Sequence, residues 1–321
     1  MTEIRLAPLA GITDWPFRVL CFEQGCDCAT TEMVSALGYV YAPKNHPATR
    51  SLLTRDPREK RLILQLFGKE PDYMARAAAA LSASGDYEGV DINMGCPAHK
   101  VASGGEGSGL MRNPALAEKI MRAVVQASTV PVSVKMRLGW DADHINVVDM
   151  ARMAQDCGVR EITVHGRTRM QMYAGEADWD QIARVKEAVQ IPVYGNGDIF
   201  TADTAVKRLR ESGVDGLVIG RGAQGNPWIF REIREALAGR PPVPPTLREK
   251  VETALRHYDM QLSWKPRHVA VAEMRKHIGW YIQGVRGAAQ MRAAVNRMEQ
   301  PEQVREALTD LLAREEREAG V

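Results

Sequence analysis

Eight short runs of β-branched and other apolar residues recur through the first three-quarters of the chain, and each is long enough for one buried strand. They cover residues 4–8, 28–33, 62–67, 90–93, 132–136, 161–165, 192–196 and 216–220. Amphipathic stretches, such as 72–84 and 113–127, separate most of the runs, so the chain advances in βα units. Eight such units can close on themselves, and the pattern therefore predicts an α/β fold built on a (β/α)8 TIM barrel.

A doubly wound open sheet is the competing arrangement for alternating strands and helices. It needs no eighth strand, and it favours a glycine-rich GxGxxG turn after its first strand. In this chain that turn reads Ala-Gly-Ile-Thr-Asp at residues 10–14, which lacks the pattern. The barrel is therefore the better prediction.

The sequence pattern changes near residue 240. Residues 239–245 read Gly-Arg-Pro-Pro-Val-Pro-Pro, and proline fixes φ and has no N–H to donate, so a stiff linker is predicted. Thr246 can cap a helix that begins at Leu247, with Glu249 as the third helical residue. We expect a barrel domain over residues 1–240 and a small all-helical domain of three or four helices over residues 246–321.

Composition places the chain among folded globular proteins. Of its 321 residues, 45% are hydrophobic and 26% are charged, which excludes a disordered chain. No apolar run approaches the roughly 20 residues of a membrane span, and the first residues do not resemble a signal peptide, so we expect a cytoplasmic protein with no membrane partner. The five cysteines suit reduced thiols, and the three at 21–28 lack the partners of a zinc site, so we expect no metal.

Two glycine-rich strand ends suggest a phosphate site. Residues 196–198 (Asn-Gly-Asp) follow the seventh run and residues 220–222 (Gly-Arg-Gly) end the eighth. Many barrels bind phosphate with the loops after these two strands, because glycine lets backbone N–H groups approach the oxygens. Arg221 can add a charge-assisted bidentate contact. Either loop alone could be an ordinary turn, but the pair predicts phosphate binding.

Three further strand ends carry polar side chains. Alternation along the fifth run directs Lys135 into the barrel mouth, where it could stabilise a group that becomes negative, such as a reduced flavin or an enolate, or could reach solvent. Gln65 offers a donor and an acceptor to a planar ring. His165 could contact a ligand or could equally be a core histidine.

Cys96 lies between Gly95 and Pro97, on a constrained turn at the end of the fourth run. A protonated thiol can donate a proton, and an ionised one can attack an electrophile. The glycine-rich stretch 103–109 follows, and we expect a mobile loop over the site there. This stretch lacks the Lys-Ser/Thr ending of a nucleotide P-loop.

These motifs together resemble the tRNA-dihydrouridine synthase family over essentially the whole chain. The resembling segments are residues 7–14, 31–33, 65–68, 93–97, 134–137, 165–168, 196–198 and 220–221, in the family's order. The Asn-Met-Gly-Cys-Pro element at 93–97 is the most specific of them. Residues 275–281 (Arg-Lys-His-Ile-Gly-Trp-Tyr) are most similar to the bacterial branch lettered B. Residues 108–110 read Ser-Gly-Leu where the family often has Ser-Ala-Leu, and this change could loosen the loop.

The resemblance implies an FMN enzyme that reduces the C5–C6 double bond of specific uridines in tRNA with NADPH. It implies FMN contacts at Pro8, Leu9, Ala10, Gln65, Lys135, His165, Asn196, Gly197, Asp198, Gly220 and Arg221. By the same resemblance, NADPH reduces FMN, the flavin passes a hydride to C6 of uracil, and Cys96 protonates C5. Asn93 would contact the target uracil, and Lys135 would stabilise the anionic reduced flavin.

The positive charge of the chain is concentrated in its helical end. Segment 263–298 holds seven basic residues and one acid, whereas the whole chain has a net charge of +2. Such a footprint suggests an RNA backbone as partner, and we expect Arg275, Lys276 and Arg286 to bind tRNA. The aromatic residues of this segment could stack on nucleotides or could fill the core of the helical domain; they are Trp264, His277, Trp280 and Tyr281.

Two other functions would use part of this pattern. A flavin barrel that acts on a small molecule, such as a dihydroorotate-dehydrogenase-like or old-yellow-like enzyme, would use the barrel mouth but not the basic helical end. A non-catalytic RNA-binding protein on a barrel scaffold would use the basic end but not Cys96 or the phosphate loops. The tRNA-modifying enzyme uses all of them.

Overall fold

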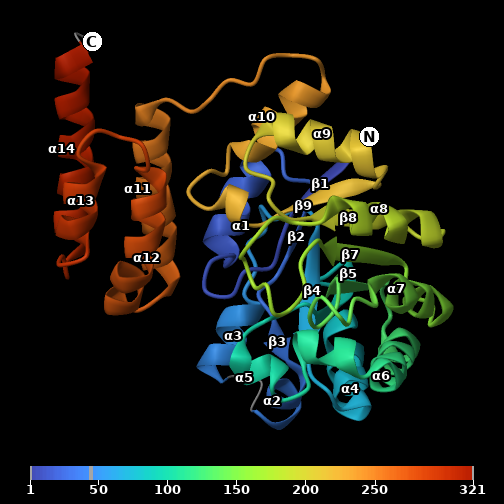
Figure 1. Ribbon diagram of the computed structural model, residues 1–321. Coiled ribbons are helices and arrows are strands. Elements are labelled where there is room, and N and C mark those ends of the chain that lie inside the picture. The colour runs from blue at the N-terminus through green and yellow to red at the C-terminus, as the bar shows by residue number, and fades with distance from the viewer. Residues whose placement is uncertain (1, 43–45, 320–321) are drawn as a thin grey trace.

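The computed structural model describes residues 2–42 and 46–319, and parallel strands form a closed barrel in it (Figure 1). The strands of the barrel are β1 (Glu3–Leu6), β2 (Cys28–Thr30), β4 (Leu62–Phe67), β5 (Gly89–Met94), β6 (Val132–Arg137), β7 (Glu161–His165), β8 (Val193–Asn196) and β9 (Gly216–Ile219). Each pairs with the next, and β1 with β9 closes the ring. The two-residue β3 (Val34–Ser35) pairs with the end of β4. The predicted (β/α)8 barrel is confirmed.

Helices surround the barrel and cover its outer face (Figure 1). They are α1 (Trp15–Glu23), α2 (Ala36–Tyr41), α3 (Pro47–Leu53), α4 (Pro71–Ser82), α5 (His99–Ala102), α6 (Pro114–Ala127), α7 (Val147–Asp156), α8 (Trp179–Ala188), α9 (Ala202–Ser212) and α10 (Ile229–Leu237). Helix α6 shows why they form: the Asn113 side chain caps it by accepting from the Leu116 N–H. Its buried residues Ala117, Ile120, Met121 and Val124 repeat at helical spacing and face the strands.

The inside of the barrel is polar below the cavity. Arg5 of β1 is 5% exposed and donates to Glu161 of β7 at 2.5 and 3.0 Å and to Tyr194 of β8 at 2.5 Å. Neither strand neighbours β1, so these bonds cross the barrel. The alternate residues Ile4 and Leu6 belong to the main hydrophobic cluster together with residues of the surrounding helices. The apolar core therefore lies between strands and helices.

In the described residues up to 319, four helices follow the proline-rich linker and lie on one side of the barrel (Figure 1). They are α11 (Leu247–Trp264), α12 (Arg267–Tyr281), α13 (Ala288–Val295) and α14 (Pro301–Ala319). The capping box of Thr246 and Glu249 is present at the start of α11. A second hydrophobic cluster joins these helices and includes Trp228 from the barrel side of the linker. Within the described ranges, no helix has the length and apolarity needed to cross a membrane.

Candidate active site

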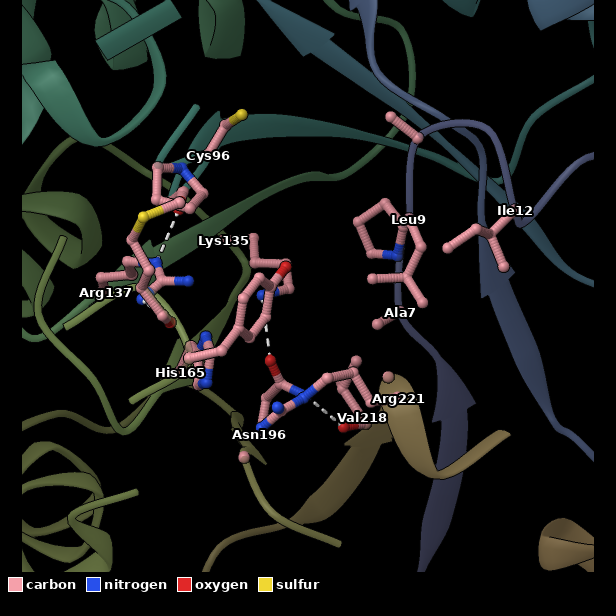
Figure 2. A pocket seen from close by; sticks show the side chains of 18 of the residues that line it. Ala7, Leu9, Ile12, Cys96, Lys135, Arg137, His165, Asn196, Val218 and Arg221 are labelled. Carbon is pink, nitrogen blue, oxygen red and sulfur yellow. Dashed lines mark hydrogen bonds between the residues drawn. The ribbon is translucent and has the colours of Figure 1, made fainter. Parts of the chain in front are cut away.

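A cavity of about 490 Å³ opens at the carboxyl ends of the strands, a size typical of small-molecule sites. It is lined by all of the predicted flavin-contacting residues, namely Pro8, Leu9, Ala10, Gln65, Lys135, His165, Asn196, Gly197, Asp198, Gly220 and Arg221. The predicted proton donor Cys96 and uracil contact Asn93 line it too. In the view of Figure 2, Lys135 lies between Cys96 and Asn196, and Leu9 faces them from the other side. The barrel thus brings together residues that are far apart in the chain.

The loops after β8 and β9 touch through their backbones. A Cβ on Gly222 would overlap the carbonyl oxygen of Ile199, and Gly197 has φ +134°, which favours glycine. A Cβ on Gly197 would also lie 2.6 Å from the Cβ of Ala177. Glycine is therefore required at both positions. The two loops form a cradle with few side chains, so an oxyanion can approach their backbone N–H groups closely.

Arg221 is held in place at the edge of this cradle by Asp198. Its Nη2 donates to Asp198 Oδ1 at 2.9 Å, and the buried Arg167 donates to both oxygens of the same carboxylate at 2.8 and 2.7 Å. Burial raises the pKa of Asp198, but the bond and charge of Arg167 outweigh this and hold that pKa below its usual value. Asp198 therefore orients two arginines, and Arg221 keeps donors for an anion.

Positive charge gathers at the centre of the cavity. Lys135 Nζ donates to Asn196 Oδ1 at 3.2 Å, and burial together with Arg137 lowers the pKa of Lys135 to about 8. Burial lowers the pKa of Arg137 to about 10. Burial and the surrounding cations, Lys135 first, hold the pKa of His165 well below its usual value, so this imidazole is neutral at pH 7. His165 is buried and also forms part of the cavity wall. With Lys135 and Arg137 beside it, the centre of the cavity suits a ligand that carries negative charge.

The turn that carries Cys96 is fixed on both sides by hydrogen bonds. Asn93 Oδ1 accepts from the N–H groups of Gly95 at 3.1 Å and Cys96 at 2.9 Å. The Cys96 carbonyl accepts from Ser108 N at 3.1 Å and Ser108 Oγ at 2.8 Å. Cys96 is a partly exposed free thiol, whereas the other four cysteines are buried. A partly exposed thiol on a rigid turn is placed to exchange a proton with a bound substrate.

The predicted mobile loop is wrong for the second half of its range. Residues 107–112 form a 3-10 helix whose first five residues are buried, and Ser108 binds the Cys96 turn directly. A Cβ on Gly109 would lie 2.6 Å from the Ala102 carbonyl oxygen, so glycine here permits close packing and does not loosen the segment. Residues 103 and 104 are exposed.

A comparison with protein-family models matches residues 5–316 to "Dihydrouridine synthase (Dus)". The chain belongs to the dihydrouridine synthase family. It is 43% identical to "tRNA-dihydrouridine synthase B" of Xanthomonas axonopodis pv. citri over 303 residues, covering 94% of this chain and 90% of that one. It is 41% identical to "tRNA-dihydrouridine synthase B" of Pseudomonas aeruginosa over 295 residues, covering 92% and 88%.

Among solved structures, the chain resembles "Crystal structure of TcOYE with pHBA" with a TM-score of 0.53 and 12% identity, covering 77% of this chain and 91% of that one. This likeness supports the barrel fold. The family assignment makes the chain a flavin-dependent oxidoreductase. The cavity fits a flavin: Gln65 and Asn93 offer polar edges for a planar ring, and the glycine cradle with Arg221 offers an oxyanion site.

Sequence reasoning missed several residues around the cavity of this family member. Arg137 was part of a resembling motif, but its role in the site was not predicted; it donates to the Gly95 carbonyl at 2.9 Å and so braces the Cys96 turn. Tyr173 and Phe200 line the rim while being 46% and 49% exposed, and the Arg221 guanidinium lies over both rings. Their loops show no regular apolar pattern, so no sequence signal identified them.

The buried Asp91 was also missed. It lies on β5 between Val90 and Ile92, and an acid inside an apolar run was the available signal. Its oxygens accept from Ser133 Oγ at 2.6 Å and Gln65 Nε2 at 2.7 Å. Burial raises the pKa of Asp91 to about 6, against the effect of these two bonds.

The three basic residues predicted to bind tRNA do not lie in one place. Arg275 and Lys276 of α12 line a groove shared with Arg292 and Trp280, whereas Arg286 lines a separate groove between α13 and α14. Lys276 also donates through Nζ to the carbonyl of Gly11, in the loop after β1. The basic face is therefore broader than one groove.

The aromatic residues of the helical end divide between core and surface. His277 and Tyr281 are each 1% exposed and belong to the interior, so they cannot stack on a nucleotide. Trp280 is half-buried and lines the groove, and Trp264 packs near Trp15 with ring centroids 6.0 Å apart. No cluster of three or more metal-ligand side chains occurs in the described part of the chain.

Proposed function

We propose that this enzyme reduces the C5–C6 double bond of specific uridines in tRNA, with FMN as its flavin and NADPH as its reductant. The observation that carries the proposal is the single cavity in which the Cys96 thiol, the Lys135 cation and the glycine cradle of β8 and β9 come together. When bound, the flavin would supply the electron pair that reduces the double bond.

The chain's own residues would bind this cofactor at two points. Arg221, the cradle around Gly197 and Gly222, and the dipoles of their backbone N–H groups suit a phosphate. Lys135 and the neutral His165 would face the ring system, and Lys135 would stabilise negative charge there. Pro8, Leu9 and Ala10 would form the opposite wall, which excludes water.

Cys96 would protonate C5 of the uracil. The carbon becomes basic as electrons enter at C6, because C5 is conjugated to the C4 carbonyl. The S–H bond breaks as the new C–H bond forms, and the thiolate then regains a proton from water, which reaches the partly exposed turn. Asn93, which lines the cavity, would contact the uracil edge.

The helical residues 246–321 would bind the tRNA while residues 1–240 carry out the chemistry, in the cytoplasm where tRNA is modified. Arg275 and Lys276 from one groove and Arg286 from another would neutralise phosphates. A stacked uracil cannot reach a flavin in the barrel mouth, so the base must swing out of the RNA.

The test uses tRNA from cells that lack this gene. The purified protein with FMN and NADPH should convert specific uridines to dihydrouridine, detected by mass spectrometry of nuclease fragments. Cys96→Ala is the matched control and should leave the same uridines unreduced. Absence of any new dihydrouridine with the wild-type protein on this tRNA would contradict the proposal, and substituting NADH or riboflavin tests the two cofactor assignments.

A further inference from the structure

Asp91 is a buried acid that lies beside the cavity without lining it. It is 5% exposed and precedes Asn93 by two residues on β5. Burial of a carboxylate is costly unless its oxygens are hydrogen-bonded, and an apolar side chain would fit a central strand without that cost. None of the steps above uses this residue, so its partners are the guide to its role.

Three successive hydrogen-bonded links lead from Asp91 to the thiol turn. Asp91 Oδ2 accepts from Gln65 Nε2 at 2.7 Å, and Gln65 Oε1 accepts from Asn93 Nδ2 at 2.8 Å. Asn93 Oδ1 then accepts from the N–H groups of Gly95 and Cys96. The links connect β4, β5 and the turn after β5 through buried side chains.

The donor and the acceptor of each hydrogen bond in this series follow from the chemistry of its two ends, the backbone N–H groups and the Asp91 carboxylate. The N–H groups of Gly95 and Cys96 can only donate, so Asn93 must present its oxygen to them and its nitrogen to Gln65. Gln65 then has its nitrogen left for residue 91, which must accept. An ionised carboxylate can only accept, so Asp91 anchors both amides in the orientation that the turn needs.

We propose that Asp91 is a positioning residue for proton transfer: its carboxylate anchors Gln65 and Asn93 and through them holds the Cys96 turn in the orientation that delivers the thiol proton. This inference rests on the proposed role of Cys96. The second N–H of Asn93 donates to Met33 Sδ at 3.6 Å, a weak acceptor, and Gln65 Nε2 donates to Asp91 alone among the described residues, so Gln65 keeps one N–H at the cavity wall.

Three variants separate the anchor from the charge of Asp91, which also acts on Lys135. Asp91→Asn keeps an acceptor for Gln65 and loses the charge. Asp91→Leu loses the acceptor and the charge and keeps the branched shape, with two methyl groups in place of the smaller oxygens. Ser133→Ala is the matched control, because it removes the bond to the other oxygen, Oδ1, and leaves the Gln65 bond intact.

The first measurement is alkylation of the FMN-loaded protein by iodoacetamide, followed site by site by mass spectrometry. Cys96 is partly exposed and the other four cysteines are buried, so only Cys96 should react quickly and the buried thiols report unfolding. We expect Asp91→Leu to change the Cys96 rate several-fold with the other thiols still protected, and Asp91→Asn and Ser133→Ala to stay near wild type. If Asp91→Leu exposes all five thiols, the smaller Asp91→Ala takes its place.

The second measurement compares the rates of the two half-reactions, NADPH oxidation and tRNA-dependent flavin re-oxidation. Asp91→Leu should slow tRNA-dependent flavin re-oxidation about 10- to 100-fold relative to Asp91→Asn, the cost of misplacing a catalytic group, and should slow NADPH oxidation far less, because the two variants share the loss of charge beside Lys135. Asp91→Asn should recover most of the rate. The inference is overturned by a wild-type rate in Asp91→Leu, by equal losses in the Asn, Leu and Ser133→Ala variants, or by equal slowing of both half-reactions. If wild-type protein forms no dihydrouridine, the proposed function fails, and the alkylation result still decides whether Asp91 anchors the turn.

Discussion

The Cys96 thiol is the residue whose loss should divide the reaction into its two halves. NADPH oxidation needs no proton from a thiol, so Cys96→Ala should leave it nearly intact. Re-oxidation by tRNA should slow about 100- to 10,000-fold, the usual effect of losing a positioned general acid. Anaerobic stopped-flow absorbance measures both steps. Cys157→Ala, which changes a buried thiol on the outer helices, is the control. A variant that oxidises NADPH slowly but reacts with tRNA at the wild-type rate would exclude the thiol as proton donor.

Arg221 should contribute to FMN affinity through the phosphate alone. Arg221→Ala removes a charge-assisted contact worth about 1.5 to 3 kcal/mol, so FMN should bind roughly 10- to 100-fold more weakly. Riboflavin has no phosphate and is the matched ligand: its affinity should be the same in the variant and the wild type. Fluorescence titration of the apoprotein measures both. An equal loss for the two ligands would place the phosphate elsewhere.

We expect the ionised Asp91 to lower the free energy of unfolding, because its carboxylate is buried. The pKa of Asp91 is about 6 in the folded protein and 3.8 as its ordinary value, so the folded state holds the proton more tightly. The contribution of Asp91 to the free energy of unfolding should therefore fall as pH rises from about 4 to about 6, so the wild type should lose stability relative to Asp91→Asn over this range. The difference in free energy of unfolding between Asp91→Asn and the wild type should therefore shift in favour of the variant by up to about 3 kcal/mol between pH 4 and a pH above 6. Urea unfolding at several pH values measures the difference, and a constant difference would contradict the pKa.

At the scale of elements, the strands were predictable and their inner faces were not. The run at 62–67 coincides with β4, because a strand buried on both faces produces an almost continuous apolar run, and the run at 161–165 coincides with β7 through its apolar Ile162 and Val164. The buried Arg5 pairs with the partly buried Glu161 inside the barrel, and no local pattern distinguishes such a paired charge from an exposed one. The short β3 lacked the length for a signal.

The candidate site was predictable to a similar degree. Glycine and polar residues at strand ends identified the cavity wall, because a barrel places those ends together. Tyr173 and Asp91 depend on contacts with residues distant in sequence, such as the Arg221 stack and the Gln65 bond, and spacing does not encode these contacts.

Helix α12 contacts the loop after β1 through Lys276, and we expect this contact to couple tRNA binding to FMN binding. Lys276 bonds to the Gly11 carbonyl, and Gly11 lies between Ala10 and Ile12, which line the cavity. Lys276→Met should weaken FMN binding several-fold and lower the slope of tRNA affinity against salt by about one contact. Arg292→Ala, in the same groove, should weaken tRNA binding only. Filter binding over a range of salt concentrations and flavin fluorescence test this, and unchanged FMN affinity in Lys276→Met would show that the link carries no coupling.

For the molecule as a whole, the proline-rich linker does not mark a boundary between two independently stable parts, because the barrel and the helices after the linker share buried contacts. Asp14 of the barrel is 6% exposed and accepts from Gln261 at 2.5 Å and Lys265 at 2.7 Å, both on the far side of the linker. Phe17 packs against the rings of His257 and His277, with centroids 5.8 and 5.7 Å apart. Removal of residues 241–321 would expose this surface.

Residues 1–240 made alone should therefore aggregate or melt well below the full chain, measured by scanning fluorimetry. The full chain cut by a protease at an engineered site within 239–245 should keep its melting temperature and its flavin, since the contacts persist without the covalent link. A stable, flavin-loaded 1–240 fragment would contradict this. The helical end is thus not a detachable module: a hybrid that grafts it from a relative with a different target uridine would have to bring matching partners for Asp14 and Phe17, or the barrel itself would be destabilised.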